Sequence, residues 1–272
     1  MSGLVFALKT APRFAVDCAG LAPGALAGKT LREIAALPLP GGESGLRVGD
    51  LFRISGKADG ETLTLLETTP QLVAVGGGMS GGTLRVEGSL GEHVGRRMRG
   101  GTLFVAGNVG DGVACGMRGG FIDVAGSAGD FAGGPAPGDV SGMRGGTVII
   151  GGNVGRRCGE RQRRGLIVVG KDAGDYCASQ MIAGTVLVRG SCSEGAGFGM
   201  RRGSLLIGQP SGTPGACFAL TGIYALPFLP LLLRHVAELK PRWRKSLAIF
   251  GNVQRWVGDA GNGGLGEILL PG

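Results

Sequence analysis

Apolar and polar residues alternate in seven short segments that follow one another along the middle of the chain. Each segment starts at a glycine, here called the marker glycine: Gly82, Gly101, Gly120, Gly146, Gly165, Gly184 and Gly203. Successive marker glycines are 19 residues apart, except for one interval of 26. The second and fourth residues after each marker are Leu, Ile or Val, and this period of two predicts a short strand with one buried face.

Apolar residues also recur at the eighth and twelfth positions after the marker glycine, and a methionine stands three positions before nearly every marker. A chain with inward-facing residues on every side of a 19-residue turn winds around its own core. We therefore predict a mainly β fold, a single-stranded right-handed parallel β-helix of about seven or eight coils. Neighbouring coils would lie about 4.8 Å apart, so equivalent positions form ladders along the axis.

The repeat divides the chain into three segments. We predict an N-terminal capping segment over residues 1–47, the β-helix repeat domain over 48–208, and a C-terminal capping and partner-contact segment over 209–272. Caps are needed because an open end of a β-helix exposes strand edges and core side chains. The long interval contains Gly133–Asp139, which predicts a surface loop, either a partner contact or a tolerated insertion.

Both caps contain short regular elements. The N-terminal cap opens with the apolar segment Leu4–Leu8, and a short helix begins at the capping box Thr30–Glu33. An irregular first strand is expected over Val48–Gly56. In the C-terminal cap, Leu231–Leu239 predicts a helix that a proline ends.

Composition narrows the class of protein. Glycine accounts for 58 of 272 residues without the period of collagen, and 43% hydrophobic residues argue against disorder. The net charge of +8 suits acidic partners or anionic ligands, but the basic cluster Lys240–Lys245 is too short to indicate nucleic-acid binding.

Phe218–Leu233 is the most apolar stretch of the chain and is too short to span a membrane. With no C-x-x-C pair and no signal sequence, we predict a cytoplasmic protein.

The sequence offers few groups for catalysis or metal binding. His93 and His235 are its only histidines. The string Pro23–Thr30 is similar to a phosphate-binding loop but lacks the first glycine, so helix capping is the favoured interpretation. Cys158 and Cys177 occupy the same inward position of adjacent coils, which predicts core packing rather than redox chemistry. We therefore predict no catalytic residue and no metal site in this chain.

Two charged rows run along the predicted rod. The acidic row, broken by Arg156, is interpreted as solvated residues beside a turn: Glu92, Asp111, Asp130, Asp175 and Glu194. The arginine row follows the methionines, with Ser80 and Ile182 as exceptions: Arg99, Arg118, Arg144, Arg163 and Arg201. Guanidinium groups about 4.8 Å apart repel one another, so this row needs anions. These come from the acidic row, an acidic protein surface or a polyanionic ligand, because guanidinium forks suit carboxylates and phosphates.

The repeat resembles a known family. The pattern Met-x-Gly-Gly-x-[LIV]-x-[VI]-x-Gly occurs at Met79–Gly88, Met98–Gly107 and Met117–Gly126, and Gly49–Gly56 precedes it. This pattern resembles the glycine-rich β-helix subunit of formylmethanofuran dehydrogenases and its counterpart in the bacterial formyltransferase/hydrolase complex. It is more distantly similar to the C-terminal β-helix domain of glutamate synthases. The resemblance covers residues 48–208.

The resemblance implies a structural role in one-carbon metabolism, in the oxidation of formaldehyde. In these relatives the β-helix holds together the subunits that perform the chemistry, so it implies a non-catalytic scaffold. In the bacterial complex a formyl group moves between a methanofuran-type carrier and tetrahydromethanopterin, and a hydrolase subunit releases formate. The implied partners are the hydrolase and formyltransferase subunits, and an acidic polyglutamyl tail of the carrier is an implied ligand of the arginine row.

Alternatives stay open at this point. One is the β-helix subunit of a tungsten or molybdenum formylmethanofuran dehydrogenase, whose metals would be held by partner subunits. Another, of a different class, is an autonomous β-helix transferase, which needs a cleft of convergent polar residues. The sequence has 22 arginines against six lysines, a bias that suggests a GC-rich genome and favours the bacterial complex.

Overall fold

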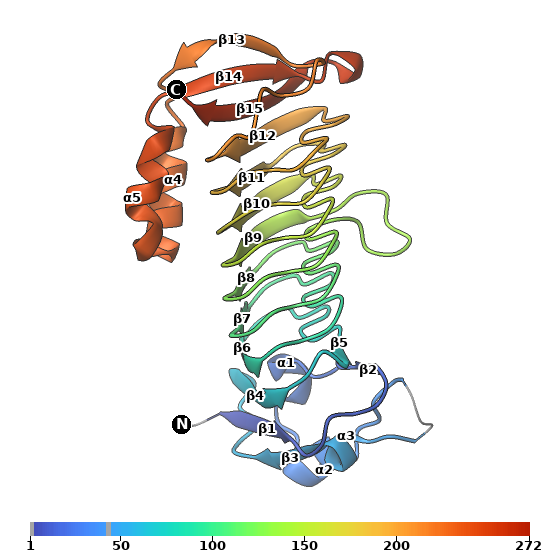
Figure 1. Cartoon of the computed structure of the whole chain (residues 1–272). Helices are drawn as coiled ribbons and strands as arrows, with labels where there is room; N and C mark the ends of the chain where they lie inside the picture. Colours follow the sequence, from blue (N-terminus) through green and yellow to red (C-terminus); the bar gives the residue numbers. More distant parts are fainter. Residues whose placement is uncertain (1–2, 42–44) are drawn as a thin grey trace.

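The chain forms a rod of stacked coils with a small cap at each end (Figure 1). The computed structural model describes residues 3–41 and 45–272. One large sheet runs along the rod, and its central strands are all parallel to their neighbours. These strands are β4 (Thr62–Thr68), β6 (Thr83–Gly88), β7 (Thr102–Val105), β8 (Phe121–Val124), β9 (Arg144–Ile150), β10 (Arg164–Val169), β11 (Thr185–Val188) and β12 (Arg202–Ile207). The predicted mainly β fold with stacked parallel coils is confirmed.

The coils stack in register. Leu103 pairs with Leu84 on the preceding coil and with Ile122 on the following one, and all three side chains are fully buried. Further round each coil, isolated bridges join the buried eighth positions Val109, Ala128, Val154, Ala173 and Cys192. Equivalent positions therefore form ladders, and the inward ones build one continuous apolar core.

Methionine and the marker glycine contact each other between neighbouring coils. A Cβ atom on Gly101 would lie 2.7 Å from Cε of Met79, and one on Gly120 would lie 2.9 Å from Cε of Met98. The φ angles of the two glycines are +84° and +94°. Only glycine leaves room for the methionine and adopts these angles without a steric cost. The Met-x-Gly-Gly pattern is thus a packing motif that joins one coil to the next.

A ladder of polar side chains stabilises the turn after each strand. Ser89 Oγ accepts a hydrogen bond from the backbone N–H of Asn108 at 3.1 Å, and Asn108 Oδ1 accepts one from the N–H of Ser127 at 2.8 Å. The same contact continues through Asn153 to Asp172. These side chains satisfy backbone groups at the corners, which lie outside the named strands.

The N-terminal cap continues the sheet beyond the coils. Its elements are β1 (Leu4–Leu8), β2 (Val16–Asp17), α1 (Pro23–Leu26), α2 (Leu31–Ala35), α3 (Val48–Leu51) and β3 (Phe52–Ser55), and β2 pairs with β5 (Leu72–Val73). β1 is parallel to β4 and antiparallel to β3. The predicted capping box is present at α2, with Thr30 and Glu33 each bonded to the other's backbone N–H. Residues 1–2 and 42–44 of the predicted cap lie outside the described residues.

The expected first strand over Val48–Gly56 is only partly a strand, so this prediction was wrong in detail. Its first four residues form the helical turn α3, where Asp50 accepts a hydrogen bond from the backbone N–H of Arg47 at 2.9 Å. β3 follows and runs antiparallel to β1, so it does not join the parallel ladder. The local side-chain contact at Asp50 favours a helical turn over an extended chain.

The C-terminal cap contains a three-stranded antiparallel extension and a helical hairpin. Its elements are β13 (Ala219–Tyr224), α4 (Leu229–Leu239), η1 (Pro241–Trp243), α5 (Arg244–Leu247), η2 (Ala248–Phe250), β14 (Val253–Gly258), η3 (Ala260–Asn262) and β15 (Leu265–Pro271). β15 pairs in parallel with β12, and β14 and β13 follow outward. The helix predicted over Leu231–Leu239 is confirmed and starts two residues earlier. No helix among the described residues has the length and apolar character to cross a membrane.

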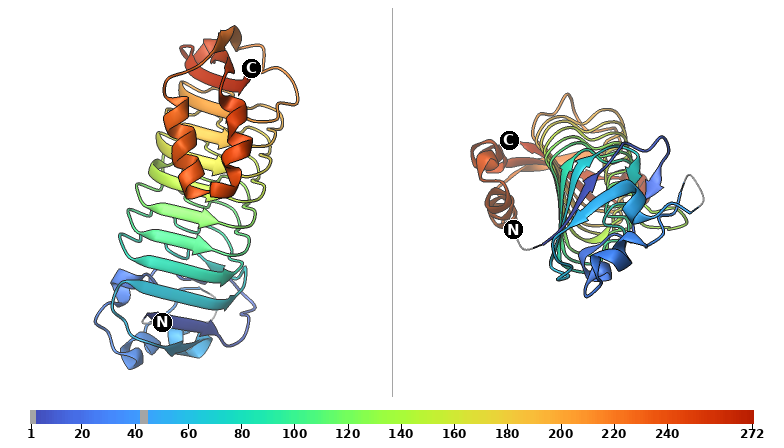
Figure 2. Two further views of the ribbon diagram at one scale, coloured as in Figure 1. Left: turned by 90° about the vertical axis from the view of Figure 1, so that its left-hand side faces the viewer. Right: turned by 90° about the horizontal axis from the view of Figure 1, so that it is seen from below.

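The helical hairpin covers the outer face of the upper coils (Figure 2). The third position after the marker glycine is polar or aromatic in the lower coils, as at Arg85 and Asp123, and aliphatic in the upper ones. The aliphatic residues Ile149, Val168, Leu187 and Leu206 are fully buried in a second core with α4 and α5. At the border, Lys240 Nζ lies 2.6 Å from Asp123 Oδ2. Burial of each aliphatic side chain contributes about 1.5–3 kcal/mol.

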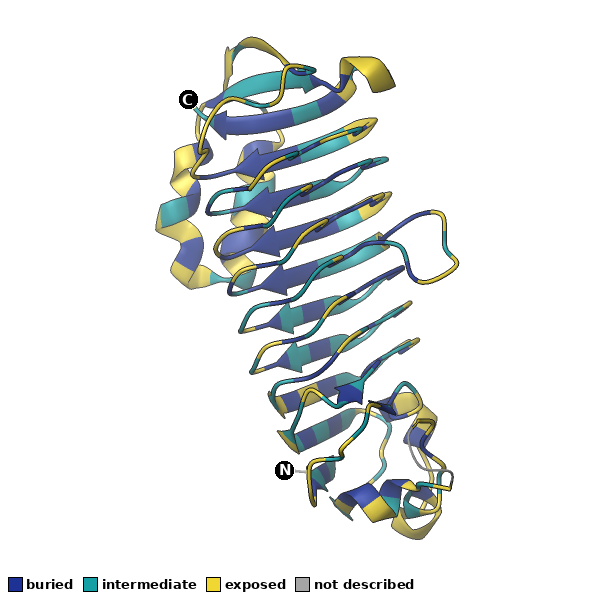
Figure 3. Ribbon diagram, turned by 45° about the vertical axis from the view of Figure 1, so that its right-hand side comes forward, coloured by how far each residue is buried: buried dark blue, intermediate teal, exposed yellow. Residues whose placement is uncertain are grey.

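The predicted loop at Gly133–Asp139 leaves the rod between β8 and β9 (Figures 1 and 3). Arg97 Nη2 holds its outer part, at 3.1 Å from Asp139 Oδ1 and 3.2 Å from the carbonyl oxygen of Pro137. Arg161 Nη1 donates to the carbonyl of Val140 at 3.4 Å. The loop is therefore tied to coils on both sides of it.

Candidate functional site

The five arginines of the arginine row lie at equivalent corners of their coils, at the start of a strand or shortly before it. Each backbone N–H donates to the carbonyl of the methionine one coil earlier, as Arg118 does to Met98 and Arg144 to Met117, both at 2.7 Å. These bonds fix the corners in register, and all five side chains are exposed. The structure thus brings the five predicted residues together in one row, which is interrupted at Ile182.

The acidic row does not neutralise the arginine row. Asp111 Oδ1 accepts a hydrogen bond from the backbone N–H of Asp130 at 2.7 Å, and Asp130 forms an ion pair with Arg156 at 3.0 Å. None of the six ion pairs in residues 3–41 and 45–272 includes an arginine of the row. Arg144 Nε donates to Ser141 Oγ at 3.0 Å. The guanidinium groups of the row therefore have no carboxylate partner within the described part of the chain.

Further arginines lie beside the row at its C-terminal end. Arg164 and Arg202 directly follow row members and begin β10 and β12, and both side chains are exposed. In the other coils this position holds glycine or, at Ala183, alanine. Sequence reasoning missed these two residues, although the change from a small residue to arginine at one position of the repeat is the signal that identifies them.

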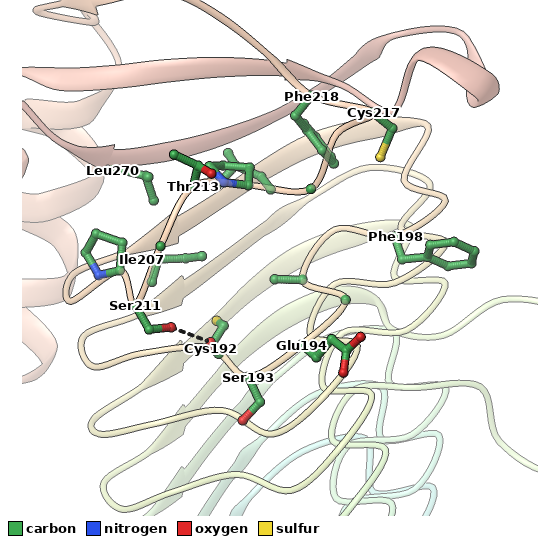
Figure 4. A pocket seen from close by; sticks show the side chains of 17 residues that line it. Cys192, Ser193, Glu194, Phe198, Ile207, Ser211, Thr213, Cys217, Phe218 and Leu270 are labelled. Carbon is green, nitrogen blue, oxygen red and sulfur yellow. Dashed lines mark hydrogen bonds between the residues drawn. The ribbon is translucent and has the colours of Figure 1, made fainter.

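A hollow of about 430 Å³ opens at the C-terminal end of the core, below the loop 209–217 (Figure 4). Its lining includes the thiols of Cys192 and Cys217 and one carboxylate, Glu194. A hydrogen bond with Cys177 and burial raise the pKa of Cys192, and burial raises the pKa of Cys217. Both thiols are therefore protonated near neutral pH and are weak nucleophiles. This lining contains no histidine to activate them.

The histidine, cysteine and loop residues considered from the sequence make packing or capping contacts. His93 Nδ1 lies 3.8 Å from the sulfur of the buried Cys115. Pro23–Thr30 forms α1 and the N-cap of α2, which confirms the capping interpretation. Cys158 and Cys177 are free thiols and fully buried in the core. Among the described residues, no three His, Cys, Asp or Glu side chains gather in the way a metal ion requires.

Comparison with known proteins shows where this architecture has been seen before. No protein-family model and no curated protein matches the sequence. A solved structure matches it, the X-ray crystal structure of the formyltransferase/hydrolase complex (FhcABCD) from Methylorubrum extorquens in complex with methylofuran. The TM-score is 0.90 at 35% sequence identity, and the match covers 98% of this chain and 99% of the other.

The parallel β-helix with these caps is therefore the architecture of one component of a multi-subunit enzyme. The chain belongs to the family of that matched component of formyltransferase/hydrolase complexes. The resemblance to a component of the formyltransferase/hydrolase complex, inferred from the Met-x-Gly-Gly repeat, is confirmed.

Proposed function

We propose that this chain is the β-helix component and non-catalytic scaffold of a cytoplasmic formyltransferase/hydrolase complex. It holds the hydrolase and formyltransferase subunits, which move a formyl group between a methanofuran-type carrier and tetrahydromethanopterin and release formate. The match to a chain of such a complex over 98% of this sequence is the observation that carries the proposal. The continuous apolar core and the in-register coils support a rigid structural role.

The scaffold role is tested with the chain alone and with its partner subunits. The purified chain is assayed for formyl transfer and for formate release, and the same assays are run after co-expression with the hydrolase and formyltransferase subunits. We expect no turnover by the isolated chain, and a complex that assembles only when the chain is present. Turnover by the isolated chain would make it an autonomous transferase, and a complete active complex without it would remove the scaffold role.

The arginine row is proposed to bind the acidic polyglutamyl tail of the carrier. The row has several guanidinium groups in line, all exposed and without a carboxylate partner in the described chain. Such groups are suited to bidentate hydrogen bonds with successive carboxylates. The structural relative was crystallised in complex with methylofuran, which supports a methanofuran-type carrier as the natural ligand.

The test of this row uses the Arg118→Ala/Arg144→Ala variant of the assembled complex. We expect its affinity for polyglutamate to fall by about tenfold or more, with little change in melting temperature because both side chains are exposed. The control Arg32→Ala/Arg234→Ala removes the same charge from exposed positions in the two caps. If the row variant binds polyglutamate as tightly as this control, the row has only a structural role.

A further inference from the structure

The arginine row has a break at Ile182, and basic side chains gather on both sides of this break. One pair of arginines is Arg163 and Arg164. A second pair, Arg201 and Arg202, occupies the same positions two coils further along the rod. Because neighbouring coils are about 4.8 Å apart, the two arginine pairs are separated by roughly 9–10 Å along the axis. The coil between them presents the uncharged Ile182 and Ala183 in their place.

Two hollows meet at this break. One has a volume of about 310 Å³ and is lined by Arg163, Arg164, Ile182, Ala183, Arg201 and Arg202. The other has a volume of about 270 Å³, shares Ile182 and Arg201 with the first, and adds polar groups from Arg161, Gln180 and Asn262. We call the two together the Ile182 recess. The larger hollow alone reaches the lower limit of small-molecule sites, about 300 Å³.

The Ile182 recess is rich in hydrogen-bond donors and poor in negative charge. Each guanidinium carries five N–H donors, and no carboxylate lines either hollow. Carboxylates of the nearby C-terminal cap are already engaged. Asp259 accepts hydrogen bonds from the backbone N–H groups of Gly199 and Gly261, and Glu267 forms an ion pair with Arg255.

We propose that the Ile182 recess anchors one multiply charged anion that bears carboxylate or phosphate groups. The anion lies over Ile182 and reaches the arginine pairs of the coils on either side. An arginine at position 182 would fill this space, which explains why the row is interrupted here. The inference deepens the proposed function, because Arg163 and Arg201 belong to the arginine row: it makes this one place the main anion site.

The test measures binding of two probes to the full chain by calorimetry at fixed ionic strength. Pentaglutamate represents a polycarboxylate tail, and inorganic tripolyphosphate represents a phosphate-bearing ligand. The variant Arg164→Gln/Arg202→Gln removes two guanidiniums found only at the recess, and Arg99→Gln/Arg118→Gln is its matched control farther along the row. We expect a 1:1 complex, weakened about a hundredfold or more by the recess variant and about tenfold by the control, because the rest of the row contributes less than its main anion site.

The outcomes separate this inference from the proposed function. Equal weakening by both variants overturns the recess but leaves the row as a uniform binding strip. No weakening by either, or no binding of either probe, overturns both. A clearly larger loss in the recess variant than in the control supports the inference, and tighter binding of pentaglutamate assigns the site to a carboxylate tail. Tighter binding of tripolyphosphate keeps the anion site but contradicts the tail as the ligand of the row.

A second variant tests the space rather than the charge. Ile182→Trp leaves the charge unchanged and fills the recess from a half-buried position. We expect it to weaken the tighter probe by about tenfold while the melting temperature stays close to that of the parent chain. Unchanged affinity in a folded Ile182→Trp variant would mean that the arginines act only as a diffuse positive surface, and it would overturn the recess.

Discussion

Gln162 stands in a core ladder that otherwise consists of methionines. Its side chain is fully buried, as are those of Met143 and Met181 on the coils before and after it. Nε2 donates to the carbonyl oxygen of Gly165 at 2.9 Å, but Oε1 has no hydrogen-bond partner among the described residues. We therefore expect Gln162→Met to stabilise the protein, because methionine has a similar length and no polar group to satisfy.

The magnitude follows from two opposing contributions. Removing a buried, unpaired oxygen removes a desolvation penalty of about 1–3 kcal/mol. Losing the Nε2 hydrogen bond costs about 0.5–1.5 kcal/mol, and some of this is recovered by the added apolar contact. The net gain is about 1 kcal/mol. For a chain of this size, that corresponds to an increase in melting temperature of about 2 °C.

The assay is thermal unfolding followed by circular dichroism, with urea unfolding as a second measurement. The reverse change, Met117→Gln, places the same polar group in another coil of the same ladder. We expect it to lower the free energy of unfolding by about 2 kcal/mol or more. An unchanged or lower melting temperature for Gln162→Met would refute the reasoning, because it would mean that Oε1 has a partner such as a buried water.

Other predictions concern packing, an ion pair and a thiol. Gly120→Ala brings a Cβ to 2.9 Å from Met98 Cε at a φ of +94°, so it should lower the free energy of unfolding in urea by about 2–4 kcal/mol. Its control is Gly24→Ala, where a Cβ meets open space, and there the free energy of unfolding should change by less than about 0.5 kcal/mol. Lys240→Met should cost about 2 kcal/mol by leaving Asp123 unpaired, and adding Asp123→Leu should recover most of it in a double-mutant cycle. In the folded chain only the partly exposed Cys217 should react with a thiol reagent such as Ellman's reagent. Because burial and Asp259 raise the pKa of Cys217, its rate should still rise with pH above pH 9, and a plateau below pH 8 would contradict this.

The coils could be predicted from sequence because every position of the repeat has one structural role. Leu84, Leu103 and Ile122 occupy the same position in three repeats, and they pair with one another in the structure. The repeat did not predict the strand β4, because Glu61 stands where later coils have the marker glycine. Its buried Leu63 and Leu65 nevertheless keep the period of two. The terminal coil is atypical because it contacts the cap rather than another repeat.

The position of the helical hairpin could also have been predicted from the repeat. The third position changes from Asp123 to Ile149 and then stays aliphatic, and an exposed strand face would not favour such residues. The hairpin covers the sheet from this change onward, with Lys240 bonded to Asp123 at its edge. The end of a polar pattern at one outward position therefore marks where another element packs.

The candidate site could be predicted only in part. Register alone placed Arg118 next to Arg99 and Arg144, because the row needs nothing beyond the repeat. The recess at Ile182 depends on the C-terminal cap, since Asn262 of η3 contributes to one of its hollows. A hollow lined by residues 80 positions apart, such as Ile182 and Asn262, follows from no repeat, so only the structure shows it.

Stacking in register places like charges next to one another, and the two charged rows differ in how this repulsion can be relieved. At about 4.8 Å, two like charges repel by roughly 0.9 kcal/mol in water. Carboxylates can accept hydrogen bonds from backbone N–H groups, as Asp111 does from Asp130, so the acidic row is stabilised by its own coils. Guanidinium groups only donate, and the carbonyls of these corners already accept backbone N–H groups, such as that of Arg118 at Met98. The arginine row therefore gains most from acceptors supplied by another molecule, and this is the physical reason for the proposal that this corner of the rod binds a ligand.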